Sequence, residues 1–132
     1  MSLHRAEVEL LKKRSKEFLE EAKIALERGS YDVACFLAEQ SLQLYLKSVL
    51  LKLVGDYPRT HSIRRLLGEI VRITDNVEIK EYARENRIRL SNLEDAYLMA
   101  RYFIKEYLRE DAADMIKTAE ETMERIRGII GD

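Results

Sequence analysis

Apolar residues recur at intervals of three, four and seven along most of the chain, which is the spacing of one face of an α-helix. Over the first segment they form a single apolar stripe opposite a charged face. Gly29 and the stretch around Pro58 supply breaks. The pattern predicts helices over about residues 2–28, 31–54, 62–74, 78–102 and 109–130, with a candidate interruption of the fourth at Ser91-Asn92. We therefore expect an all-α fold, an up-and-down four-helix bundle with an additional short helix, in one domain of residues 1–132.

The segment 31–54 differs from the others because it is apolar at nearly every angle around its axis. One partner helix cannot bury such a surface. A helix of this kind lies at the centre of its domain, or buries one face in the domain and another against a second subunit. In a chain of 132 residues the second arrangement is favoured. We therefore predict a homodimer with this helix in the interface.

The composition narrows the class of protein. One proline and five glycines among 132 residues exclude an all-β fold, which needs frequent turns. A net charge of −1 gives no overall basic field for nucleic acid. Cys35 is the single cysteine, so an intrachain disulfide is excluded, and with only His4 and His61 it does not suffice for a zinc site.

Two features of the sequence bear on where in the cell the protein is located. Residues 1–18 contain no apolar stretch typical of a secretory signal. The apolar segment 33–54 is interrupted by Glu39, Lys47 and Lys52, which are costly inside a membrane. We expect a cytoplasmic protein without a membrane segment. Many Lys, Arg and Glu with few Gln and Asn fit a heat-adapted organism.

Motifs for several chemistries are missing from the sequence. There is no Glu-x-x-His pair for a di-metal bundle and no glycine-rich phosphate loop. Cys35 lies between Ala34 and Phe36 on the apolar helix and is predicted to pack in the core. We therefore predict no catalytic residue, no metal and no cofactor.

Two groups of residues, in the predicted helix 31–54 and in the loop after it, are candidates for ligand binding. His61, with arginines close by, can hold phosphate at a helix N-terminus, or it can simply brace the loop. Gln40, Gln43 and Lys47 lie on one helical face at steps of three and four. They either line a ligand groove, or the lysine reaches water and the two amides are solvated or paired across a dimer interface.

A third candidate group lies in the segment 78–102 and combines guanidinium groups with aromatic rings. It consists of Arg84, Arg87, Arg89, Tyr97, Arg101 and Tyr102. Rings beside guanidinium groups are suited to stacking on a base and contacting phosphate. The acidic residues interleaved with them also fit a solvated helix face crossed by ion pairs.

The residues also carry a resemblance to a known family. The run ALERGSYDVACFLAEQS at 25–41, the Leu46-Lys47-Ser48 triplet and the later Thr60-His61-Ser62-Ile63 resemble the HEPN domain family. The pair Arg101-Tyr102 and the segment 110–112 fit the same pattern, so the resemblance covers about residues 5–130. It implies a dimeric helical bundle, often encoded beside a minimal nucleotidyltransferase, that binds nucleotides or acts on RNA.

One part of the family pattern is missing. Members that cleave RNA carry an arginine followed, after about four to six residues, by a histidine that can transfer protons. The positions that would need arginine ahead of His61 are Val54, Gly55 and Asp56, and no histidine follows Arg101. The resemblance therefore implies no catalytic residues here.

Three functions stay open from the sequence. The first is a binding module for a nucleotide, a minimal nucleotidyltransferase or both. Its predicted ligand-binding residues are Lys47, His61, Tyr97, Arg101 and Tyr102. The second is a divergent metal-independent ribonuclease, the toxin of a toxin–antitoxin pair. The third is a structural accessory subunit without a ligand site.

Overall fold

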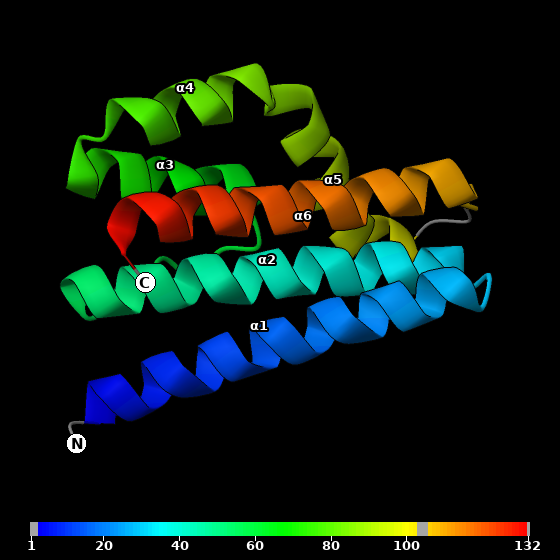
Figure 1. The fold of residues 1–132 in the computed structure, drawn as a ribbon, viewed down its shortest axis with the longest axis horizontal. Coiled ribbons are helices and arrows are strands. Elements are labelled where there is room, and N and C mark those ends of the chain that lie inside the picture. Colours follow the sequence, from blue (N-terminus) through cyan, green and yellow to red (C-terminus); the bar gives the residue numbers. More distant parts are fainter. Residues whose placement is uncertain (1–2, 103–105, 132) are drawn as a thin grey trace.

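The computed structural model describes residues 3–102 and 106–131, and the side chains of residues 4–99 and 106–131. In these ranges the chain folds entirely into helices and connecting loops (Figure 1). The helices are α1 (Leu3–Glu27), α2 (Tyr31–Val54), α3 (Ile63–Thr74), α4 (Val77–Glu85), α5 (Arg87–Tyr102) and α6 (Arg109–Ile130). The predicted all-α bundle is confirmed. No helix in the described part of the chain has the length and apolar character needed to span a membrane.

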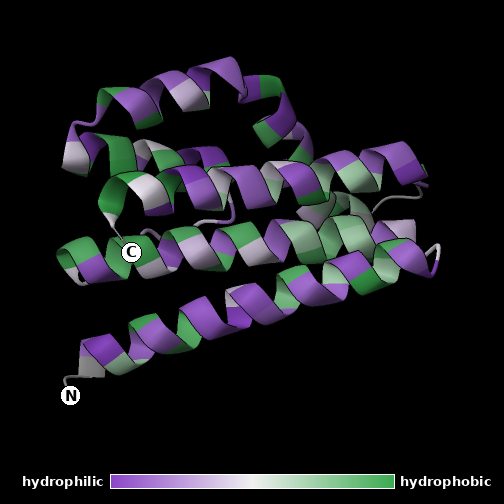
Figure 2. Ribbon diagram, viewed as in Figure 1, coloured by the Kyte–Doolittle hydropathy of each residue, from purple (hydrophilic) through white to green (hydrophobic). Residues whose placement is uncertain are grey.

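Helix α2 is the central element of the bundle. It contacts α1, α3, α5 and α6, and Figure 1 shows it between α1 on one side and α6 on the other. Figure 2 shows that α1 carries many more hydrophilic residues than α2, as expected for an outer helix. Helix α2 is therefore central in its domain, and the burial of part of its surface against a second subunit stays a prediction.

The link between α1 and α2 reverses the chain in three residues. Gly29 has φ of +80°, a left-handed conformation that glycine adopts without steric cost. The backbone N–H of Gly29 donates to Leu26 and that of Ser30 to Ala25, which satisfies carbonyls at the end of α1. Helices α1 and α2 consequently pack as antiparallel neighbours (Figure 1).

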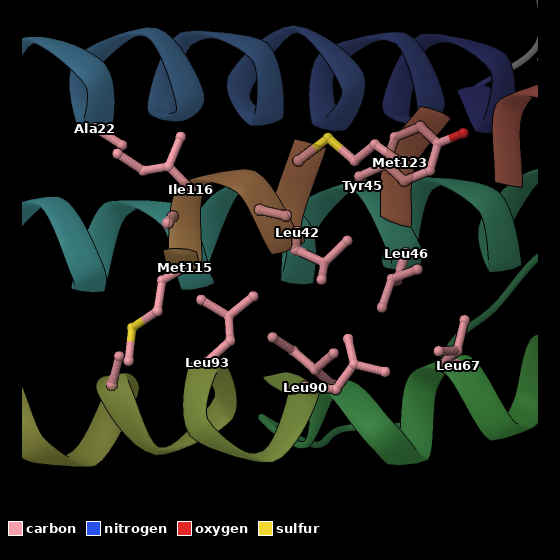
Figure 3. Close-up of a cluster of buried hydrophobic side chains, with 14 of the residues drawn as sticks. Ala22, Leu42, Tyr45, Leu46, Leu67, Leu90, Leu93, Met115, Ile116 and Met123 are labelled. Atoms are coloured by element: carbon pink, nitrogen blue, oxygen red, sulfur yellow. The ribbon is translucent and has the colours of Figure 1, made fainter. Parts of the chain in front are cut away.

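The core lies between α2 and the helices around it. Figure 3 shows Leu42 and Leu46 of α2 among side chains from α5 and α6. Leu90 and Leu93 approach from α5, and Met123 comes from α6. All of these side chains are buried. Because the core surrounds α2 on several sides, residues of α2 that reach the surface do so along one narrow stripe.

The segment predicted as one helix over residues 78–102 is two helices, and this corrects the predicted number of elements from five to six. The break is at Asn86, whereas Ser91 and Asn92 lie inside α5. The Asn86 side-chain amide donates to the Tyr82 carbonyl oxygen at 3.0 Å, and the Asn86 backbone N–H donates to the same oxygen. A side-chain amide that competes for helix carbonyls in this way ends the helix.

The loop between α2 and α3 is held against α5. The hydroxyl of Ser62 accepts from the Arg65 backbone N–H, which caps the start of α3. The same hydroxyl donates to Glu94 of α5 at 2.7 Å, and Arg64 forms a 3.1 Å ion pair with that carboxylate. These contacts bring the loop, the start of α3 and the middle of α5 to one face of α2.

Candidate functional site

A buried carboxyl group organises the polar residues of α2. Glu39 is 0% exposed, and each of its carboxylate oxygens accepts one glutamine amide. Gln40 Nε2 donates to Oε1 and Gln43 Nε2 donates to Oε2, both at 2.7 Å. Lys47 Nζ in turn donates to Gln43 Oε1 at 2.9 Å. We call these four residues, Glu39, Gln40, Gln43 and Lys47, the α2 polar row.

The surroundings of the α2 polar row shift the pKa values of two of its groups, Glu39 and Lys47. Burial raises the pKa of Glu39 to about 7, and hydrogen bonds from Gln40 and Gln43 together with the charge of Lys47 oppose that rise. The nearby Glu94 carboxylate adds to it. Burial lowers the pKa of Lys47, the Glu39 charge opposes this, and Arg59 contributes to the lowering. The row therefore contains a carboxyl group that changes its charge near neutral pH.

The loop residue Tyr57 lies over the end of the α2 polar row. The Lys47 ammonium is 5.5 Å from the centre of the Tyr57 ring, and the Arg59 guanidinium is 5.4 Å from the same centre. Both distances are within the range of a cation–π contact. Two cations, one from α2 and one from the loop, are thus gathered at this end of the row.

Three rings come together at the other end. The His61 and Tyr97 rings stack with centroids 4.2 Å apart and an interplanar angle of 18°. The Tyr97 hydroxyl and His61 Nε2 are hydrogen-bonded at 3.3 Å. Phe36 of α2 lies 6.2 Å from the Tyr97 ring, at 26°. We call Phe36, His61 and Tyr97 the ring cluster.

The structure brings three of the five predicted ligand-binding residues to this face of α2. Lys47 comes from α2, His61 from the loop and Tyr97 from α5. The side chains of Arg101 and Tyr102 lie outside the described residues. Glu39 is not among the predicted site residues, and its only signal in the sequence is a carboxylate within an otherwise apolar turn.

Two arginines of the third candidate group, Arg84 and Arg89, make ion pairs. Arg84 contacts Glu81 at 2.6 Å within α4. Arg89 of α5 contacts two carboxylates of α6, Asp114 at 3.3 Å and Glu121 at 3.2 Å. These contacts favour the interpretation of this group as a helix face crossed by ion pairs.

The described cavities lie elsewhere on the bundle. A cavity of about 510 Å³ between α1 and α6 is lined by residues such as Lys16 and Arg127. A second cavity of about 450 Å³ lies where α1 meets the end of α2. Neither cavity is lined by Lys47, His61 or Tyr97. In the described ranges, no group of three His, Cys, Asp or Glu side chains is arranged to hold a metal ion.

The comparisons with known proteins agree with this fold. The model of the HEPN domain matches residues 8–129. The chain belongs to the HEPN domain family. A similar solved structure is the crystal structure of ST0689, described as an archaeal HEPN homologue. It is 27% identical in sequence, with a TM-score of 0.67, and the match covers 93% of this chain and 97% of that chain.

The family assignment confirms the resemblance seen in the sequence and its extent. The matched region contains all of α2, the loop with His61 and the helix with Tyr97. No curated protein matched the chain.

Proposed function

We propose that this HEPN domain is a binding module for a nucleotide, and that the ligand lies along the exposed side of the α2 polar row. The observation that carries the proposal is the combination of stacked rings and paired cations on one face. The ring cluster offers a surface for a base, since aromatic side chains stack on bases of any sequence. Lys47 and Arg59 offer positive charge for phosphate.

The spacing of these groups suits a nucleotide. Phe36 and Lys47 are both on α2, and a rise of about 1.5 Å per residue separates them by about 16 Å along the helix axis. This is comparable to an extended nucleoside triphosphate. The buried Glu39, acting through Gln43, holds Lys47 at the cationic end.

We expect nucleotides to stabilise the folded protein in a thermal-shift screen against adenine, guanine, cytosine and uracil nucleotides. A ligand that binds only the native state raises its melting temperature by mass action. The shift should be lost in Lys47→Ala and kept in Lys80→Ala, which removes an exposed lysine of α4. A folded protein that shifts with no nucleotide would contradict the proposal and favour an accessory subunit without a ligand site.

We also propose that the module is a homodimer that packs through the apolar residues of the exposed stripe of α2, with the nucleotide beside them at the edge of the dimer interface. Val33 is 52% exposed, and Leu37 and Leu44, one and three turns further along the same face, are half-buried. An apolar stripe of this kind on a central helix is suited to packing against a second copy.

Sedimentation velocity checks the dimer. The wild type is expected to sediment as a dimer at micromolar concentration, and Leu44→Glu as a monomer, because a carboxylate in an apolar interface is costly. Val77→Glu, a change at a 69% exposed position of α4, should stay dimeric. A monomeric wild type would refute this part of the proposal.

For the protein partner we propose a minimal nucleotidyltransferase, on the strength of the family resemblance. The alternative of a divergent ribonuclease lacks support from the described residues, because His61 is engaged with Tyr97 and no arginine stands ahead of it at the required spacing. RNA cleavage by the isolated protein that disappears in His61→Ala would revive that alternative.

A further inference from the structure

We infer that the proposed nucleotide site selects bases that carry an exocyclic amino group, because Gln40 presents an amide oxygen of fixed orientation at the surface. The inference rests on the proposed function and names the ligand class more narrowly. It depends on which way the two glutamine amides of the α2 polar row are turned.

The Glu39 carboxylate fixes that orientation above about pH 7, where the group is mostly ionised. An ionised carboxylate only accepts hydrogen bonds, so a glutamine beside it must offer its nitrogen. Gln40 and Gln43 both do so, at 2.7 Å. A glutamine amide in water is free to turn over, whereas these two are held with the nitrogen toward Glu39 and the oxygen away from it.

The two amide oxygens, Gln40 Oε1 and Gln43 Oε1, differ in their hydrogen-bond partners. Gln43 Oε1 accepts from Lys47 Nζ at 2.9 Å. Gln40 Oε1 accepts no hydrogen bond from the part of the chain that the structure describes, and the Gln40 side chain is half-buried. The surface therefore holds one oriented acceptor that a ligand can satisfy.

This acceptor lies next to the place where a base would stack. Gln40 follows Phe36 by one helical turn on the same face of α2. Phe36 belongs to the ring cluster, and the cations Lys47 and Arg59 lie further along. A base stacked on the rings, with its phosphates toward Lys47, turns an edge to the Gln40 oxygen. An amino group on that edge donates to the oxygen, and an edge without a donor leaves it unsatisfied.

The test compares nucleotides that differ in this amino group alone. Isothermal titration calorimetry at pH 8, where Glu39 is mostly ionised, measures ATP against purine riboside 5′-triphosphate, which lacks the 6-amino group. CTP against its 4-deamino analogue is the second pair. The wild type is expected to bind the amino-bearing member about three- to tenfold more tightly, which corresponds to one net hydrogen bond.

Two matched variants locate the effect. Gln40→Met keeps the length of the side chain and removes its oxygen. The ratio of the affinities for the amino-bearing nucleotide and its amino-free analogue is therefore expected to fall to about one. Gln43→Met makes the same change at the glutamine whose oxygen already holds Lys47. It is expected to weaken the binding of both nucleotides and to leave the ratio of their affinities unchanged.

The outcomes separate the inference from the function on which it rests. Binding of neither nucleotide overturns the proposed function and the inference together. Equal affinities in the wild type overturn the inference and leave nucleotide binding standing, and this comparison needs no variant to fold. A ratio that persists in a folded Gln40→Met protein overturns the assignment to Gln40.

Discussion

The Glu39→Gln variant is expected to gain stability over the wild type as the pH rises, by about 3 kcal/mol in total. Burial raises the pKa of Glu39 from 4.5 to about 7 in the folded protein, and one pKa unit corresponds to about 1.36 kcal/mol. Between these two values the folded state holds a proton that the unfolded chain has released. Wild-type stability from this group is therefore fully present below about pH 4.5 and is lost as the pH rises through about 7.

The charged and polar groups that act on Glu39 set the size of this effect. Lys47, Gln40 and Gln43 on α2 favour the ionised form, whereas Glu94 on α5 disfavours it. Glutamine at position 39 keeps the shape of the side chain and cannot ionise, so it removes the pH-dependent term.

Urea unfolding of both proteins from pH 4.5 to 8 measures the difference. The free energies of unfolding should diverge with increasing pH in favour of Glu39→Gln. Glu78→Gln, at an exposed position in the first turn of α4, is the control and should stay within about 0.5 kcal/mol of the wild type throughout. Parallel curves for the wild type and Glu39→Gln would show that the carboxyl group does not hold its proton in the folded state.

Leu42→Ala is expected to destabilise the bundle by about 2–5 kcal/mol. Leu42 is 0% exposed and lies in the core between α2, α5 and α6 (Figure 3). Removing its branched end loses the transfer free energy of the methyl groups and leaves a cavity in a closely packed region.

The matched control is the same substitution elsewhere on α2. Leu53 is 37% exposed in the last turn, and Leu53→Ala is expected to cost less than about 1 kcal/mol. Urea unfolding at one protein concentration compares the two variants, since the stability of the proposed dimer would depend on concentration. Equal losses at the two positions would mean that α2 is not the centre of the core.

Most of the fold could be predicted because it depends on local periodicity. The bounds of α2 and α6 follow from the apolar spacing and from Gly29 and Gly131, both of which have positive φ. The sequence pattern suggests an interruption at Ser91-Asn92, whereas the structure has the break at Asn86. A side-chain amide ends a helix only where it reaches a carbonyl, and Asn86 reaches that of Tyr82 while Asn92 continues the helix.

Individual residues of the candidate site could be predicted from the sequence, but the contacts that bring them together could not. Lys47 shares a face with two glutamines because of helical spacing, which a sequence displays directly. The stacking of His61 on Tyr97 joins residues 36 positions apart, and such a contact depends on how the loop packs on α5. Helical spacing also places Glu39 on the face of Gln43, four residues further on, but the burial of its carboxyl group depends on how the surrounding helices pack on α2, which a sequence does not display.

The most direct test of the nucleotide-binding account follows the side-chain amides by NMR. Gln40 and Gln43 are the only glutamines in the chain, so their side-chain ¹⁵N–¹H signals are assigned by their loss in the Gln40→Met and Gln43→Met variants. Titrating the ¹⁵N-labelled wild type with ATP is expected to shift both glutamine signals together with backbone signals at Lys47, His61 and Tyr97. Shifts confined to the cavity between α1 and α6, or no shifts at all, would contradict the account.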